Sequence, residues 1–200
     1  MPVPAKRGQE TVDRLLDAAL DVYSQRGRDG FSLTAVLELS GVSVGSLYHH
    51  FSNFDGLSAT LYNRCTADLL TELLACLDPH DNAADGVRAM AAGYLEWSAK
   101  NPAKARIVHF LPYAGYLPDN AKPVDPEPAD LYREIVMWFN PYLVSGHIQP
   151  LAPVMIELLV CGPVAATTKR WLAGDPGIDM NDAARLIPER VWQSVRGPRG

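Results

Sequence analysis

The residues best suited to chemistry lie in one short run, residues 41–51, which reads Gly-Val-Ser-Val-Gly-Ser-Leu-Tyr-His-His-Phe. Its hydroxyls and imidazoles donate and accept hydrogen bonds. It lacks paired carboxylates, a nucleophile with its base, and the ligand spacing of a metal site. The small side chains of Val44, Gly45 and Ser46 let a backbone approach the edge of a base pair closely. The run therefore suggests recognition of a polar partner rather than catalysis.

Two short helices are predicted around this run. Ser32 is a good N-cap for a helix over residues 33–39, and Ser43 for a helix over residues 44–50. Gly41 supplies the turn between them, because glycine readily adopts a left-handed backbone. Two short helices joined by a three-residue turn form a helix-turn-helix, which places the start of its second helix in the major groove of DNA.

This segment resembles the N-terminal domain of the TetR family of transcriptional repressors. The resemblance is carried by Phe31-Ser32, Gly41-Val42-Ser43 and Gly45-Ser46-Leu47-Tyr48-His49-His50-Phe51. It extends back over the preceding helix and forward to Leu57. It implies binding to double-stranded DNA, and the contact residues predicted on this basis are Thr34, Ser43, Val44, Gly45, Ser46, Tyr48, His49 and His50.

The chain departs from the family at Phe54, where a lysine aimed at a phosphate is usual. Either this phosphate contact is lost, or Lys6 and Arg7, in an N-terminal arm expected to be disordered, replace it. Such an arm can reach the minor groove, unless it is merely solvated. Two further side chains have alternatives. Tyr48 can instead pack against the first helix, and His50 can hydrogen-bond within its own turn.

Charge agrees only in part with a DNA-binding protein. The 200 residues have a net charge of −5, with 48% hydrophobic and 20% charged residues, which is an ordinary globular composition. In the first sixty residues, five Lys and Arg stand against seven Asp and Glu. Phosphate contacts must therefore come largely from hydroxyls and backbone N–H groups. We expect a shallow dependence of DNA affinity on salt.

Clean period-two strands are absent, so the predicted fold class is all-α. A three-helix N-terminal helix-turn-helix domain with its arm, residues 1–56, precedes a C-terminal helical ligand-binding and dimerisation domain, residues 57–200. A proline-rich loop is predicted at 112–128 and a tail from Arg196. The spacing of apolar residues and the helix-breaking residues predict helices at about 10–27, 33–39, 44–50, 54–77, 81–100, 103–111, 127–144, 150–173 and 181–195.

In the family that the chain resembles, the C-terminal domain binds a small molecule and forms a dimer. Aromatic walls suit a flat or apolar effector, although aromatics at helical spacing are alternatively core residues. The predicted effector-binding residues are Tyr94, Trp97, Phe110, Tyr113, Tyr116, Trp138, Phe139 and Tyr142. Helix 150–173 is apolar nearly all round, which predicts burial on all sides and a subunit interface. The predicted homodimer residues are Leu151, Met155, Leu158, Leu159, Trp171, Leu186, Val191 and Trp192.

Several classes of protein are disfavoured. The chain has no catalytic motif, no metal-ligand cluster and no cofactor signature, so an all-helical enzyme is not expected. It has no apolar run long enough to cross a membrane and no signal peptide, and three unpaired cysteines are typical of reduced thiols in the cytoplasm rather than of a redox sensor. The remaining alternative to a DNA-binding regulator is a helical adaptor that binds only protein.

Overall fold

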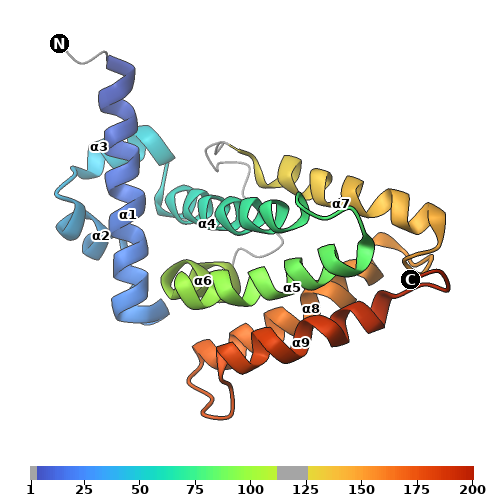
Figure 1. Cartoon of the computed structure of the whole chain (residues 1–200). Helices are drawn as coiled ribbons and strands as arrows, with labels where there is room; N and C mark the ends of the chain where they lie inside the picture. The colour runs from blue at the N-terminus through green and yellow to red at the C-terminus, as the bar shows by residue number, and fades with distance from the viewer. Residues whose placement is uncertain (1–3, 112–125) are drawn as a thin grey trace. The chain divides into compact units, whose positions relative to one another are not determined.

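The computed structural model describes residues 4–111 and 126–200, with the backbone alone for residues 4–7. The all-α prediction is confirmed, because the described residues form helices and no strand (Figure 1). The helices are α1 (Pro4–Gly30), α2 (Leu33–Ser40), α3 (Val44–Phe51), α4 (Phe54–Leu77), α5 (Ala83–Lys100), α6 (Pro102–Phe110), α7 (Pro128–Ser145), α8 (Pro153–Leu172) and α9 (Met180–Val195). Among these, none is long and apolar enough to cross a membrane.

Backbone contacts divide the chain into two compact units. The first contains the described residues of 1–66 and 103–125, and the second those of 67–102 and 126–200. The division falls inside α4 rather than near its start, where the sequence analysis placed a domain boundary. Helix α6 belongs to the first unit although it follows α5 in the sequence.

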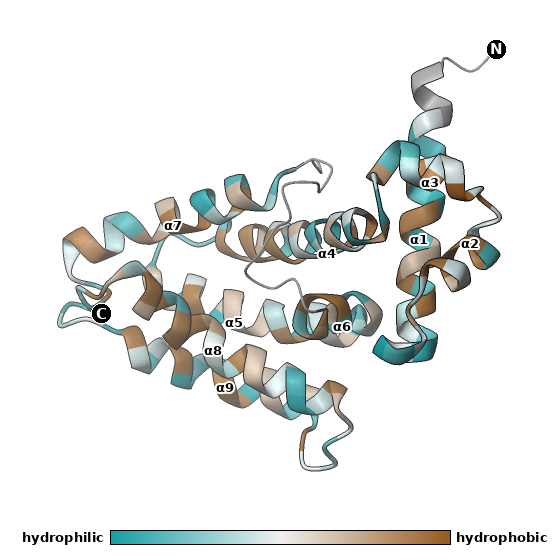
Figure 2. Ribbon diagram, turned by 180° about the vertical axis from the view of Figure 1, so that it is seen from behind, coloured by the Kyte–Doolittle hydropathy of each residue, from teal (hydrophilic) through white to brown (hydrophobic). Residues whose placement is uncertain are grey.

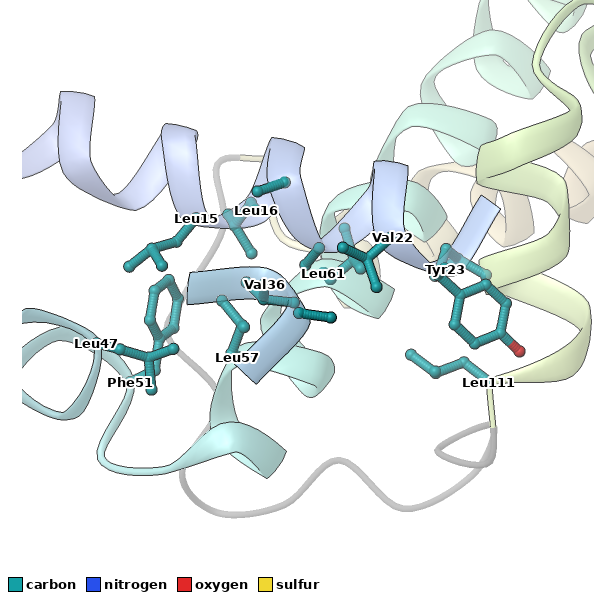
Figure 3. Packing of buried hydrophobic residues seen from close by; sticks show 14 of the residues in the cluster. Leu15, Leu16, Val22, Tyr23, Val36, Leu47, Phe51, Leu57, Leu61 and Leu111 are labelled. Carbon is teal, nitrogen blue, oxygen red and sulfur yellow. The ribbon is translucent and has the colours of Figure 1, made fainter. Parts of the chain in front are cut away.

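Apolar side chains from α1 to α4 converge on a single core in the first unit (Figure 3). They are predicted by the helical spacing of the sequence, since they fall on one face of each helix. Burying each leucine or phenylalanine contributes about 1.5–3 kcal/mol. The residues at the centre of this core are Leu15, Leu16, Val22, Val36, Leu47, Phe51, Leu57 and Leu61. The same core holds α2 and α3 against α1.

Helix α1 begins earlier than the sequence analysis predicted. The N-terminal arm was expected to be disordered, but the backbone is helical from Pro4 onward. Proline suits the first turn of a helix, where its missing N–H would have no partner, and the alanine, lysine and arginine that follow favour helix. Near the predicted end of the helix, Gly27 interrupts the regular geometry with φ of 63°.

In the second unit, α8 buries one stripe of residues, spaced by four, rather than its whole surface. The stripe consists of Ile156, Val160, Val164, Thr168 and Leu172. A single chain thus buries one side of α8, and the burial of its other side at a subunit interface stays a prediction. The helix packs on α5 and α9 through this stripe. Figure 2 shows apolar segments along α8, and Val154 and Leu158 of this helix are both 57% exposed.

The C-terminal residues are folded rather than extended as a tail. They follow α9 and return along the turn between α7 and α8, where Gln149 N donates to Val195 O at 2.8 Å and Gly197 N donates to His147 O at 2.8 Å. An isolated antiparallel bridge pairs Ile148 with Arg196. These bonds satisfy backbone groups at the end of α9 that would otherwise need water.

Candidate nucleic-acid interface

The turn between α2 and α3 has the local geometry that the sequence predicts. Ser32 Oγ accepts a hydrogen bond from Ala35 N at 3.3 Å, and Ser43 Oγ accepts one from Ser46 N at 3.2 Å. Gly41 adopts the left-handed conformation, with φ of 64°. Both N-caps and the glycine turn are therefore confirmed.

The core fixes which side of α3 faces outward. Leu47 and Phe51 are 0% and 1% exposed, so one face of the helix is committed to the packing in Figure 3. Val44 and Tyr48 flank that buried face and are 46% and 48% exposed. About half of the Tyr48 side chain is therefore open to a partner, and its contact with DNA stays a prediction. His49 lies beside it and is exposed.

The remaining predicted contact residues have graded exposure. Thr34 lies in the first turn of α2 and is exposed, as is Ser43. Ser46 is half-buried, and its hydroxyl lies 3.0 Å from Ser43 Oγ. His50 is half-buried, with its ring centroid 5.0 Å from that of His49. The first turns of α2 and α3 thus place exposed hydroxyls next to helix N-termini, whose N–H groups favour phosphate.

Gly45 has no structural reason to be glycine. Its backbone φ is not positive, and a Cβ built on it meets no atom within 4 Å. Glycine inside a helix costs about 1 kcal/mol relative to alanine. The fold alone would therefore be more stable with alanine at this exposed position. A glycine here is explained if another molecule must approach the backbone closely.

The interface carries little formal charge. Residues 31–53 contain no lysine or arginine, and Glu38 is their one carboxylate. Phe54, at the position where a lysine was expected from the resemblance, instead packs its ring 4.9 Å from that of Phe31. The first unit therefore uses this position for its core. The side chains of Lys6 and Arg7 lie outside the described residues, so their predicted contacts stay predictions.

A family model described as bacterial regulatory proteins of the tetR family matches residues 15–59. This match covers the end of the long first helix, the helix-turn-helix and the start of α4. The N-terminal domain is that of a TetR-family regulator. The match links residues 15–59 to DNA binding and transcription regulation.

Curated relatives match a part of the chain of similar length. An uncharacterised HTH-type transcriptional regulator of Mycobacterium tuberculosis is 40% identical over 58 residues, which is 28% of this chain and 30% of that protein. A regulator of Mycobacterium bovis with the same description matches equally. The chain therefore matches less than a third of the length of these relatives.

Solved structures extend the likeness of fold beyond the TetR segment. A TetR-family transcription regulator of Marinobacter aquaeolei VT8 has a TM-score of 0.76 at 15% identity, over 96% of this chain and 99% of that one. A TetR-like transcriptional regulator of Rhodococcus sp. RHA1 has a TM-score of 0.63 at 21% identity, over 92% and 94%. The fold is therefore that of TetR regulators, an N-terminal helix-turn-helix with a C-terminal helical domain.

The sequence did not predict a role for two residues near the candidate nucleic-acid interface. Leu39, in the last turn of α2, is 52% exposed beside the turn. Helical spacing places Leu39 between Ala35 and Val36 on the buried side of α2, so periodicity gave no signal of its exposure. Arg14 contacts the turn from α1, and no local pattern connects residues so far apart in sequence.

The predicted aromatic pocket is not assembled as expected. Tyr94, Trp97 and Phe139 are almost fully buried in the second unit, and Trp97 Nε1 donates to Asp68 Oδ2 at 2.8 Å. Trp138 and Tyr142 lie against each other, with ring centroids 4.7 Å apart. Phe110 belongs to α6 in the first unit, while Tyr113 and Tyr116 lie outside the described residues. Most of these aromatics therefore serve as packing residues.

A small apolar cavity does lie between α7 and α8, with a volume of about 60 Å³. Of the predicted aromatic set, only Phe139 is among the described residues that line it. At its edge Tyr132 Oη donates to Glu157 Oε2 at 2.8 Å, which raises the pKa of Tyr132 to about 12. Burial raises the pKa of the lining thiol Cys161 to about 12. The cavity is thus an apolar chamber with one carboxylate at its edge.

The predicted dimer residues separate into three groups by their exposure. Met155, Leu158 and Leu186 are 43%, 57% and 69% exposed. Leu151, Leu159 and Trp171 are half-buried. The inclusion of Val191 and Trp192 is corrected, because both are buried within their own unit, where Arg88 lies 5.8 Å from the Trp192 ring centroid. Neither side chain is available to a second copy.

Proposed function

We propose that this chain is a transcriptional repressor that binds a palindromic DNA operator as a homodimer and leaves it when a small apolar or aromatic effector binds. The observation that carries the proposal is the exposed start of α3. There Gly45 leaves open space beside Val44 and Tyr48, and the core fixes the orientation of the helix. Such a surface matches the direct readout of base edges in the major groove.

The test begins with a selection of duplexes from a random pool by the wild-type chain, followed by affinity measurements with Gly45→Ala. We expect the variant to melt at the same or a higher temperature, because a Cβ there meets nothing in the protein. We expect its affinity for the selected duplex to fall at least about tenfold, since the methyl group separates backbone from base. Equal affinity of both proteins would contradict the proposal, and selection of no duplex would favour the helical adaptor.

The effector would act by shifting the population of dimers between two arrangements of the reading helices. A molecule that prefers one arrangement of the two reading helices lowers operator affinity by its differential affinity for the two states. The cavity between α7 and α8 supports an apolar effector, because its walls include Ile135, Phe139 and Val160. At about 60 Å³ it is smaller than a typical ligand site, so the helices would have to move apart on binding.

Aromatic and aliphatic compounds that raise the melting temperature of the chain identify candidate effectors. The proposal expects at least one of them to release the selected duplex at concentrations that saturate the protein. Stabilising compounds that leave DNA affinity unchanged would argue against ligand control.

A further inference from the structure

A polar contact within the first unit joins α1 to the turn of the helix-turn-helix. Arg14 Nη2 donates a hydrogen bond to the backbone carbonyl oxygen of Ser40 at 2.6 Å. Ser40 is the last residue of α2, and Gly41 follows it with a left-handed backbone. A Cβ added to Gly41 would lie 3.5 Å from the same Nη2 atom. The guanidinium therefore lies directly against the turn.

The other polar groups of the turn are satisfied from within it. Leu37 O accepts from Gly41 N at 3.0 Å, and Ser40 Oγ lies 3.4 Å from the same oxygen. Ser40 Oγ in turn accepts from Val42 N at 3.2 Å. These bonds make the turn locally rigid, but they do not connect it to α1. The bond from Arg14 to Ser40 O supplies such a connection.

The electrostatics favour this arrangement. The last carbonyls of a helix carry partial negative charge, and a cation near them is stabilising. A hydrogen bond with a charged donor is also shorter and stronger than a neutral one. Arg14 thus stabilises the end of α2 both through its positive charge and through a directed hydrogen bond to Ser40 O. Its side chain is exposed, so the bond is made without burying a charge.

We propose that Arg14 is a positioning residue for DNA reading: it ties the α2–α3 turn to α1 and so fixes the angle at which α3 presents Val44 and Tyr48. This inference rests on the proposed function. Hydrogen bonds to base edges weaken steeply with misalignment, whereas contacts with phosphate tolerate it. Loss of the tie should therefore reduce discrimination between sequences more than it reduces affinity for DNA in general.

The experiment compares Arg14→Met and Arg14→Lys with the wild type, and uses Arg26→Met as the matched control. Arg26 is an exposed arginine of the same helix, so its loss removes the same charge without touching the turn. Affinities are measured for a duplex selected by the wild type and for a scrambled duplex of equal composition, over a range of salt concentrations.

We expect Arg14→Met to bind the selected duplex about tenfold more weakly, the loss typical of one charge-assisted hydrogen bond. Its affinity for the scrambled duplex and its salt dependence should match those of Arg26→Met. Arg14→Lys should recover part of the discrimination, because lysine retains a charged donor. Hydrogen exchange of the Val42 and Ser46 amides should accelerate in Arg14→Met while core amides of α1 stay protected.

Three results would overturn the inference. Equal losses on both duplexes, with a salt slope lower by about one, would make Arg14 a phosphate contact. Unchanged discrimination would mean that the tie has no part in reading. Unchanged exchange at the turn would show that it does not hold the turn, even if Arg14→Met binds poorly for another reason. Failure of the wild type to select any duplex would instead remove the proposed function itself.

Discussion

At the scale of single residues, the polar groups of α3 divide by whether the protein already uses them. The hydroxyl of Ser43 caps the helix, and that of Ser46 lies 3.0 Å from it. Val44 and Tyr48 are 46% and 48% exposed, so about half of each side chain is open to a partner. Direct reading of DNA is therefore expected to depend most on Tyr48, with the serines setting the shape of the helix end.

Replacing Tyr48 by phenylalanine removes one hydroxyl and leaves the ring. We expect affinity for the selected duplex to fall up to about tenfold, the usual contribution of a hydrogen bond, with no change in melting temperature, because the side chain is 48% exposed. Tyr62→Phe is the control, since Tyr62 packs against the core of the same unit. A full-affinity Tyr48→Phe protein would remove this hydroxyl from the interface, and equal loss in Tyr62→Phe would point to a general effect on folding.

At the scale of elements, α5 and α9 are joined by a polar contact as well as by apolar packing. Arg88 Nε donates to Glu189 Oε2 at 2.6 Å, and this bond lowers the pKa of Glu189 below its ordinary value of 4.5. A lowered carboxylate pKa means that the folded state holds the charged form more strongly than the unfolded state does. The contact therefore stabilises the pair of helices above pH 4.5, and this contribution is lost as the pH falls through the lowered pKa.

The lowered pKa of Glu189 gives a prediction for the variant Glu189→Gln. The variant should melt below the wild type at pH 7, and the two melting temperatures should converge as the pH falls below the ordinary glutamate value of 4.5. Glu96→Gln is the comparison, because Glu96 pairs with Lys100 at 3.4 Å and this ion pair lies within one helix. A difference between Glu189→Gln and wild type that persists unchanged at low pH would show that the ion pair is not its cause.

The ends of α2 and α3 show which features the sequence alone predicts. Ser32, Gly41 and Ser43 act within three or four residues of themselves, so their roles were predictable from local chemistry. The bond from Arg14 to Ser40 spans 26 positions and has no local pattern. The aromatic residues were ambiguous for a similar reason. Helical spacing gives the apolar side of a helix, whereas its neighbours decide whether that side lines a cavity or a core.

At the scale of the whole molecule, the exposed apolar residues of α8 and α9 need an explanation. Val154, Leu158 and Leu186 are each more than half exposed, and large apolar patches in water are unfavourable. Two copies packed through these helices would form a four-helix bundle related by a two-fold axis. The same symmetry would present two copies of α3 to the half-sites of a palindrome. Dimerisation and operator binding are thus expected to be lost together.

The double variant Leu158→Lys/Leu186→Lys tests this coupling. We expect the wild type to sediment as a dimer and the variant as a monomer, because like charges would meet across the two-fold axis. The monomer should bind a single half-site weakly and lose the added affinity of the full palindrome. Met137→Lys is the matched control, since Met137 is 62% exposed but lies on α7. If Met137→Lys dissociates the dimer and the double variant does not, the interface lies on α7. A wild type that sediments as a monomer would refute the two-fold model altogether.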